Sequence, residues 1–487
     1  MIGRWPAKSR RGGPAHKPRG MGWSQAEILA ATGGAILRQG RERRFGEVVT
    51  DSSKVKSGSV FVALKGERHD GHRFLGAAVR RGARCVIVHQ SVDTAALRGA
   101  TAVRVSDTLR ALGELAHYRR EKFAPRVLAI TGSNGKTTTK EMVAAILEEG
   151  RLDGQPLRGK VLKTEGNFNN LVGLPLTLLR LRRRDKVAVV ELGTNHPGEI
   201  QRLAEIADPD MGIITSVGAA HLEGLKSLAG VAREKGALYR NIRAGGAIAV
   251  NLDDPWVRRL GARFKGRKIT YGDRGQVRAR SWRARGGKGL EFSLQAGRKR
   301  CRVKLNYLGR HNIANALGAA ALTLGAGVGL PAVRRGLAKA KPFSMRMQIE
   351  DWRGVSIIND SYNANPASMN AALATLAEIE GRGNKIAVLG DMFELGKQAD
   401  KAHRSLGEAA AAAAVDALYL LGERAAEVRK GALRGGLRRE QIVLGRDHAG
   451  LARLLRERLK KGDWLLVKGS RGMKMEKVLQ EIKGGRG

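Results

Sequence analysis

The sequence predicts an α/β protein of three domains built on largely parallel sheets. At 487 residues the chain exceeds one ordinary domain. Short apolar runs, which are typical of buried strands, alternate along most of it with stretches of helical periodicity. We predict a basic, disordered tail over residues 1–20, followed by domains at 21–120, 121–340 and 341–487.

The first domain is expected to be a small α/β unit. In WSQAEILAATGG, Ser24 suits an N-cap and Gly33 and Gly34 suit the end of the helix. Further on, apolar strands at 59–64 and 85–88 flank a helix at about 73–81. This order of elements predicts a small sheet covered by helices.

The central block reads as a doubly wound parallel sheet. The runs VLAIT, KVAVVELG, MGIITSVG and GAIAVNLDD suit buried strands, and each ends in polar or small residues. Carboxyl ends of parallel strands share one rim of a sheet, which is where ligands bind. We therefore expect Glu191, Thr215, His221, Asn251 and Asp253 on that rim.

The third block repeats the pattern and predicts a Rossmann-like α/β domain. It begins after KPFSMR, where Pro342 interrupts the preceding helix. Its strands also end in polar residues, namely Asp360, Asp391 and Lys468. Two domains whose functional edges face each other form a cleft, which suits a two-substrate reaction that must exclude water.

Residues 129–142, AITGSNGKTTTKEM, have the pattern of a phosphate-binding loop between a strand and a helix. Lys136 would reach the terminal phosphates of a nucleotide, and the Thr137 hydroxyl would bind Mg²⁺. The spacing is short: Ile130 stands where the general pattern has its first glycine, and the glycine follows at Gly132. The alternative is a Gly-rich turn that only connects the two elements.

Three further residues are candidates for chemistry. Glu191 is the best candidate for a carboxylate that binds Mg²⁺; the alternative is a carboxylate solvated at a strand end. His221 could supply a nitrogen ligand or serve as a structural hydrogen-bond partner, and Lys235 would by default be a surface lysine. No Ser/His/Asp or Cys/His constellation points to a nucleophilic enzyme.

The formal net charge of +44 leaves two interpretations open. Basic residues are scattered along the whole chain and aromatics are sparse, which favours an Arg-rich solvated surface over a nucleic-acid site. The alternative is an affinity for RNA or a membrane surface in addition to another function. The two cysteines, Cys85 and Cys301, are far apart in sequence, and we find neither a secretory signal nor a membrane span, so we predict a cytoplasmic protein.

Seven motifs in order give the chain a family resemblance. They are TGSNGKTTTKEM, GNFNNLVGLPLTLL, ELGTNHPGEI, AAHLEG, AREKGAL, GRHNIANALGAA and NDSYNANPASMNAAL. Together they closely resemble the Mur ligases, the ATP-dependent amide ligases that build the peptide stem of peptidoglycan. The resemblance covers about residues 21–480, and the shortened TGxxGKT loop is the family's own variant.

The resemblance implies a UDP-binding first domain, a P-loop ATPase domain and a C-terminal ligase domain. ATP would be held by Gly132, Ser133, Asn134, Gly135, Lys136, Thr137 and Thr138, together with Asn315, Arg346 and Asp360. One Mg²⁺ would bind Thr137 and Glu191, and a second would bind His221 and a carbamylated Lys235. Lys136, Lys235 and His221 would be catalytic, and the substrates would contact Ser52, Lys65, Asn169, Asn170, Tyr362, Asn363, Asn365 and Lys468.

Within the family, residues 360–366, DSYNANP, resemble the branch that adds D-Ala-D-Ala to UDP-N-acetylmuramoyl-tripeptide. One departure is Asp51-Ser52-Ser53, where the family usually has DSR, so Lys54 or Lys65 would have to replace a basic contact to the uridine diphosphate. We predict a monomer without nucleic-acid partners. Two alternatives remain, another Mur-type ligase with a different amino-acid substrate and a nucleic-acid-dependent P-loop ATPase.

Overall fold

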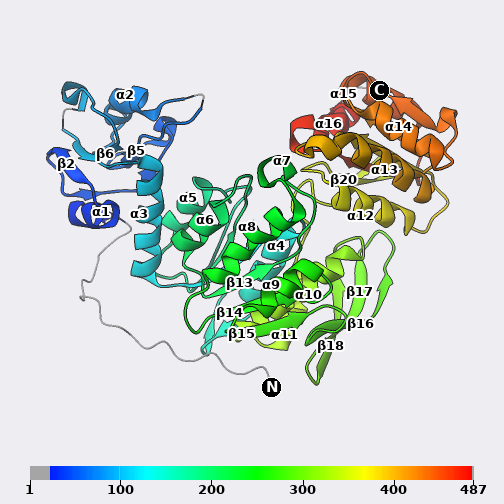
Figure 1. Cartoon of the computed structure of the whole chain (residues 1–487), viewed down its shortest axis with the longest axis horizontal. Helices are drawn as coiled ribbons and strands as arrows, with labels where there is room; N and C mark the ends of the chain where they lie inside the picture. Colours follow the sequence, from blue (N-terminus) through cyan, green and yellow to red (C-terminus); the bar gives the residue numbers. More distant parts are fainter. Residues whose placement is uncertain (1–21, 68, 98, 485–487) are drawn as a thin grey trace.

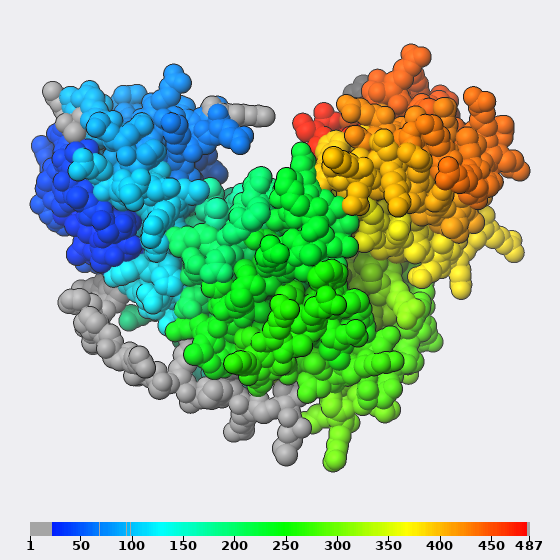
Figure 2. Space-filling view, in the orientation of Figure 1, coloured from blue at the N-terminus to red at the C-terminus, as the bar shows by residue number. Residues whose placement is uncertain are grey.

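The computed structural model describes residues 22–67, 69–97 and 99–484, arranged in three lobes around sheets of five, nine and six strands. The N-terminal and C-terminal lobes stand apart on either side of the central lobe (Figure 1), and the space-filling view shows a hollow between them (Figure 2). The predicted tail at 1–20 lies outside the described residues. The three-domain α/β architecture predicted from the sequence is confirmed.

The N-terminal lobe has a five-stranded sheet in the order β2-β7-β6-β5-β4, parallel except for β2. Helix α1 (Gln25–Thr32) begins as predicted, because Ser24 and Glu27 form a capping box, and it ends at Gly33 with φ 62°. The other elements are α2 (Leu75–Arg80), β1 (Trp23–Ser24), β2 (Ala35–Arg38), β3 (Arg44–Phe45), β4 (Val48–Val49), β5 (Val60–Val62), β6 (Cys85–Val88) and β7 (Thr101–Arg104).

Helix α3 (Thr108–Phe123) connects the first lobe to the second. Its buried residues, among them Leu112 and Leu115, pack in one continuous core with Ile28 of α1 and Leu203 of α6 (Glu199–Ala207). The predicted boundary at residue 120 falls inside this helix, and the exact domain limits stay a prediction.

The central sheet has the order β11-β12-β8-β13-β14-β15-β16-β17-β18. The strands from β11 to β16 are parallel, and β16 also begins an antiparallel meander with β17 and β18, an extension that the sequence does not predict. The strands are β8 (Arg126–Thr131), β11 (Val161–Lys163), β12 (Val187–Glu191), β13 (Met211–Ile214), β14 (Ala247–Asn251), β15 (Arg267–Tyr271), β16 (Val277–Ala284), β17 (Leu290–Ala296) and β18 (Lys299–Leu305), with a separate hairpin of β9 (Arg151–Leu152) and β10 (Gln155–Pro156).

Helices cover both faces of this sheet, as a doubly wound fold requires. One face packs against α4 (Lys136–Glu148), α10 (His311–Gly325) and α11 (Leu330–Lys339). The other packs against α3, α5 (Gly173–Leu179), α6, α8 (Leu228–Arg240) and α9 (Pro255–Ala262), with the short α7 (Leu222–Leu225) beside them. Strands β12, β8, β13 and β14 are neighbours, so their carboxyl ends meet at one rim.

The C-terminal lobe has a six-stranded sheet in the order β19-β20-β24-β21-β22-β23, with only β19 antiparallel. Its strands are β19 (Gln348–Trp352), β20 (Val355–Asp360), β21 (Lys385–Gly390), β22 (Ala417–Leu421), β23 (Ile442–Leu444) and β24 (Trp464–Lys468); its helices are α12 (Pro366–Ala377), α13 (Ala399–Ala412), α14 (Ala425–Arg434), α15 (His448–Arg458) and α16 (Glu476–Gly484). Among the described residues, no helix has the length and apolar character needed to cross a membrane.

Candidate active site

The predicted phosphate loop lies between β8 and α4, as expected. Gly135 is the N-cap of α4 with φ 79°, so the first turn of a 13-residue helix opens directly onto the loop. The Lys136 ammonium donates to the carbonyl oxygen of Gly132 at 2.7 Å and therefore lies folded over the loop. Burial lowers the pKa of Lys136, Arg346 lowers it further, and Glu191 opposes the shift.

The loop glycines are required by close packing. A Cβ on Gly132 would lie 1.9 Å from Thr215 Oγ1, and a Cβ on Gly135 would lie 2.2 Å from Asn315 Oδ1. The first contact explains why glycine is needed at position 132, where Thr215, the residue that follows β13, lies against the loop. The second distance shows that Asn315 of α10, a predicted ATP contact, lies against the start of α4.

Replacing Gly135 with alanine is expected to weaken ATP binding at least ~10-fold, because both the positive φ and the Asn315 contact would distort the loop. Gly154→Ala is a matched control, since Gly154 has φ 78° and a Cβ added there would meet nothing within 4 Å. Calorimetric titration with ATP measures both variants. Equal ATP affinity in Gly135→Ala and the wild-type protein would show that the contact does not shape the loop.

Thr137 and Glu191, predicted to share a Mg²⁺, are in direct contact. The Thr137 hydroxyl donates to Glu191 Oε2 at 2.9 Å, and Asn169 Nδ2 donates to Glu191 Oε1 at the same distance. Glu191 is only 1 % exposed. A hydroxyl and a carboxylate held together beside a phosphate loop are oxygen donors of the kind that Mg²⁺ prefers, so this pair fits the ion.

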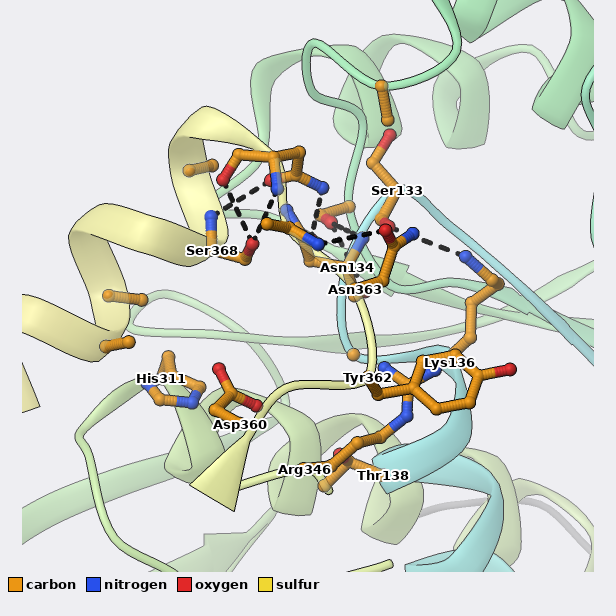
Figure 3. Close-up of a pocket in the computed structure, with 18 of the residues that line it drawn as sticks. Ser133, Asn134, Lys136, Thr138, His311, Arg346, Asp360, Tyr362, Asn363 and Ser368 are labelled. Atoms are coloured by element: carbon orange, nitrogen blue, oxygen red, sulfur yellow. Dashed lines mark hydrogen bonds between the residues drawn. The ribbon is translucent and has the colours of Figure 1, made fainter. Parts of the chain in front are cut away.

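A cavity of about 470 Å³ extends from the loop to the C-terminal lobe. Figure 3 shows Lys136 and Thr138 on α4 facing Asp360, Tyr362 and Asn363 from the C-terminal lobe. The predicted residues that line the cavity are Ser133, Asn134, Gly135, Lys136, Thr138, Thr215, His221, Asn251, Asn315, Arg346, Asp360, Tyr362, Asn363, Asn365 and Lys468. Gly132, Thr137, Asn169, Asn170, Glu191 and Lys235 are outside this lining, and Asn170 instead caps the start of α5.

Asp360 and Lys468 form a buried ion pair at the ends of β20 and β24. The Lys468 ammonium donates to Asp360 Oδ2 at 2.5 Å and to the Asn363 carbonyl oxygen at 2.9 Å. His311, beside Asp360 in Figure 3, has its pKa lowered by burial to about 4, so the imidazole is neutral at pH 7. Lys468 is thus occupied in holding Asp360 and the Asn363 backbone, a role that the sequence does not indicate.

Tyr362 lies between two arginines at the cavity wall. The Arg346 guanidinium is 4.1 Å from the centre of the Tyr362 ring, and that of Arg471 is 5.9 Å from it. Both distances are within the range of cation–π attraction. The wall therefore presents two cations near the loop, as a site for phosphate groups requires.

Two side-chain contacts and one backbone hydrogen bond join the central and C-terminal lobes. His221 Nδ1 is 2.6 Å from Glu394 Oε2, and the Glu223 amide donates to the Glu394 carbonyl oxygen at 3.3 Å. Asn365, which also caps α12, donates from Nδ2 to Asn134 Oδ1 of the phosphate loop at 2.8 Å. The hydrogen bond to His221 lowers the pKa of Glu394.

Lys235 on α8 is buried, with 1 % of its surface exposed, and its side chain forms no hydrogen bond with another residue that the structure describes. Burial, with a further contribution from the charge of Lys136, lowers its pKa well below the ordinary value. The default prediction that Lys235 lies at the surface is therefore wrong. No group of three or more His, Cys, Asp or Glu side chains that could hold a metal occurs within the described ranges.

The predicted UDP-sugar contacts, Ser52 and Lys65, lie in the N-terminal lobe and do not line the cavity. Ser52 begins a short 3₁₀ turn whose Asp51 accepts from the Ser53 amide and hydroxyl. Lys54 pairs with Asp51 at 3.7 Å, and Arg81 donates to the Ser52 carbonyl oxygen at 3.4 Å. Arg81 thus supplies a basic group beside the turn that lacks the usual arginine.

Sequence reasoning missed several residues of the site. His311, Glu394 and Arg471 line the cavity, and none was predicted. His311 stands inside GRHNIANALG, from which only Asn315 was selected, so a signal was present for it. Glu394 and Arg471 are recognised only once the two lobes are placed together.

A P-loop sheet facing a Rossmann-like lobe across a cavity, with an oxygen-donor pair beside the loop, defines a nucleotide-dependent two-substrate enzyme. Three family descriptions match the chain: "Mur ligase family, catalytic domain" at residues 45–120, "Mur ligase middle domain" at 130–323, and "Mur ligase, glutamate ligase domain" at 345–471. The chain belongs to the Mur ligase family.

Relatives resemble the chain over nearly its full length. UDP-N-acetylmuramoyl-tripeptide–D-alanyl-D-alanine ligase of Escherichia coli is 37% identical, covering 91% of this chain and 95% of that protein. A crystal structure of MurF from Acinetobacter baumannii has a TM-score of 0.86 and 32% identity, covering 95% and 99% of the two chains. MurF ligase from Thermotoga maritima in complex with ADP has a TM-score of 0.79 and 29% identity, covering 90% and 97%.

Proposed function

We propose that this chain is an ATP-dependent ligase that joins D-Ala-D-Ala to UDP-N-acetylmuramoyl-tripeptide, a step of peptidoglycan precursor synthesis. The observation that carries the proposal is the cavity between the phosphate loop and the C-terminal lobe, which is lined by residues of both. The similarity to ligases of this name over nearly the whole chain supports the choice of substrates.

ATP would bind with its phosphates at the amides of residues 132–138 and the start of α4. Lys136 would turn from the Gly132 carbonyl toward the terminal phosphate, and Arg346 would contact the nucleotide from the opposite wall. Asn315 lies against Gly135, where it would help to fix the nucleotide. Asp360, already held by Lys468 and the Met347 amide, offers its remaining acceptor capacity to a ribose hydroxyl.

Thr137 and Glu191 would hold one Mg²⁺, which when bound would draw charge from the terminal phosphates of ATP. His221 and a carbamylated Lys235 are proposed to hold a second ion. In the structure the Nδ1 atom of His221 is within hydrogen-bond distance of Glu394, which leaves its Nε2 atom to bind the second ion. A carboxylate that fixes one ring nitrogen of a histidine is a common way to orient the other toward a ligand.

The reaction is proposed to take two transfers. An oxygen of the tripeptide's terminal carboxylate attacks the γ-phosphorus, the bond to the bridging oxygen breaks, and ADP leaves with Lys136 near the developing charge. The amine of D-Ala-D-Ala then attacks the acyl carbon of the acyl phosphate. Loss of a proton and departure of inorganic phosphate give the amide.

The C-terminal lobe would position the dipeptide. Tyr362 and Asn363 line the cavity on that side, and Asn365 connects the lobe to the phosphate loop through Asn134. These contacts would hold the lobes together around the acyl phosphate and limit its hydrolysis. The UDP group would lie at the N-terminal lobe near Ser52 and Lys65, with Arg81 as an added basic contact.

The test is ADP release with each substrate omitted in turn. We expect release to require ATP, UDP-N-acetylmuramoyl-tripeptide and D-Ala-D-Ala together, and to fall at least ~10-fold without the dipeptide, because the acyl phosphate has no other amine to react with. Free diaminopimelate and glutamate are the controls for the sister reactions. Strong stimulation by either in place of the dipeptide would overturn the choice of substrate, while stimulation by RNA would favour a nucleic-acid-dependent ATPase.

Cytoplasmic location and a monomeric state stay predictions.

A further inference from the structure

The antiparallel meander at the edge of the central sheet carries a concentrated positive charge. Residues 277–305, which span β16, β17 and β18, contain ten Lys or Arg residues and a single acid, Glu291. The three strands lie at the lower right of the molecule in Figure 1, away from the hollow between the outer lobes. None of the residues of this meander lines the cavity of the candidate active site.

The pairing register places most of these charges on one face. Directly paired residues of neighbouring strands share a face, and Arg283, Glu291 and Lys304 form one such row. Arg278, Gln295 and Arg300 form another, and Ser293 pairs with Arg302 between them. Arg280, in the bulge of β16, joins the same face because its Nε donates to Gln295 Oε1 at 2.7 Å.

This outer face, defined by Arg278, Arg280, Arg283, Arg300, Arg302 and Lys304, is neutralised only in part. Glu291 accepts from Arg283 at 2.6 Å and lies 3.5 Å from Arg302. The side chains of these two arginines nevertheless remain 73% and 77% exposed. Arg300 and Lys304 form no ion pair with any residue that the structure describes.

We propose that the outer face docks the protein on a bilayer rich in anionic phospholipid headgroups. Six cations against one carboxylate on a single sheet face complement a layer of negative charge, and a headgroup layer presents its phosphates over a surface rather than along a line. The aromatic residues of the meander, Trp282 and Phe292, pair in register with Val303 on the opposite face, so the outer face offers no ring on which the bases of a single strand could stack, which disfavours RNA. It has no apolar side chain to insert either, so the attachment is electrostatic and peripheral.

Docking of this kind leaves the reaction cavity open, because the cavity lies between the central and C-terminal lobes and the face lies on the outer edge of the central sheet. The inference does not depend on the proposed ligase activity. Because the attraction is electrostatic and extends only over a Debye length, the affinity of the protein for the bilayer should fall steeply as ionic strength rises.

The test is co-sedimentation of the full chain with phosphatidylcholine vesicles that contain about a third phosphatidylserine, at low salt and at about 0.15 M salt. The variant Arg300→Thr/Arg302→Thr/Lys304→Thr should bind at least ~10-fold more weakly, because each basic residue near an anionic surface adds several-fold. The matched control, Arg182→Thr/Arg183→Thr/Arg184→Thr, removes the same charge from exposed residues elsewhere in the central lobe and should change binding less than ~2-fold. If the first variant does not fold, Arg300→Gln/Lys304→Gln takes its place, since neither side chain has an ion pair to lose.

Four results would overturn the proposal. The wild-type chain could bind pure phosphatidylcholine as well as the anionic vesicles, or bind neither. Both triple variants could lose vesicle binding equally, which would make the affinity a property of net charge. Finally, the β18 variant could lose affinity for a duplex RNA while keeping its affinity for vesicles, which would make the face a nucleic-acid site.

Discussion

Alanine in place of Lys136 is expected to lower turnover at least ~10³-fold, the effect of removing a charge from a transferring phosphoryl group. The ammonium lies 2.7 Å from the Gly132 carbonyl and lines the cavity, so it needs only a side-chain rotation to reach a phosphate. Among the described residues, Lys136 is the only lysine on α4 or the phosphate loop that lines the cavity, and Arg346 and Arg471 line it from the C-terminal side.

The measurement is the kcat of ADP release at saturating substrates, with the thermal midpoint as the check on folding. Lys136→Arg is the matched control, because it keeps the positive charge and changes only the shape of the group. We expect it to retain more activity than the alanine variant. Near-normal turnover in a folded Lys136→Ala protein would exclude this loop as the phosphate site.

Lys235→Ala is expected to be nearly inactive and to be partly restored by acetate. An ammonium group would repel a Mg²⁺ ion, but the carbamate formed with CO₂ is anionic and offers oxygen donors. Only the neutral amine has the lone pair that attacks CO₂, and burial lowers the pKa of Lys235 well below its ordinary value, which favours the neutral form over the ammonium. A small carboxylate could occupy the vacated anionic position.

Chemical rescue of the Lys235→Ala variant distinguishes the carbamate hypothesis from a role of Lys235 as a cation. Acetate should raise the activity of Lys235→Ala in a concentration-dependent manner, whereas short alkylamines should not. Lys140→Ala is the matched control, because Lys140 is also buried but donates to the Thr164 carbonyl at 2.7 Å and lies 2.9 Å from Glu141, so acetate should not restore it. Restoration of Lys235→Ala by alkylamines alone would show that the group acts as a cation.

Local patterns predicted much of the fold. The strand–loop–helix around Gly132 and Gly135, the cap at Ser24 and the buried strand at 85–88 all have the predicted form, because each depends on residues close in sequence. The position of Glu191 beside the phosphate loop was also expected, since parallel strands deliver their ends to one rim, and in the structure Glu191 accepts from the Thr137 hydroxyl.

Features that depend on distant residues escaped prediction. The strands β16 and β18 alternate arginine with apolar residues, so their sequence reads as short basic clusters until the register shows the charges on one face. The contact of His221 with Glu394 joins residues 173 positions apart. The burial of Lys235 and the Asp360–Lys468 pair likewise follow from packing between elements, on which a single sequence carries no local signal.

The central claim is that the chain activates a carboxylate with ATP and passes it to D-Ala-D-Ala. The most direct measurement uses UDP-N-acetylmuramoyl-tripeptide labelled with ¹⁸O in its terminal carboxylate and follows the inorganic phosphate by mass spectrometry. Because one carboxylate oxygen leaves with the phosphate, we expect one labelled oxygen in the phosphate released for each amide formed. Amide formation that releases phosphate without label would contradict the acyl-phosphate route, and release of phosphate without any amide product would contradict the ligase function.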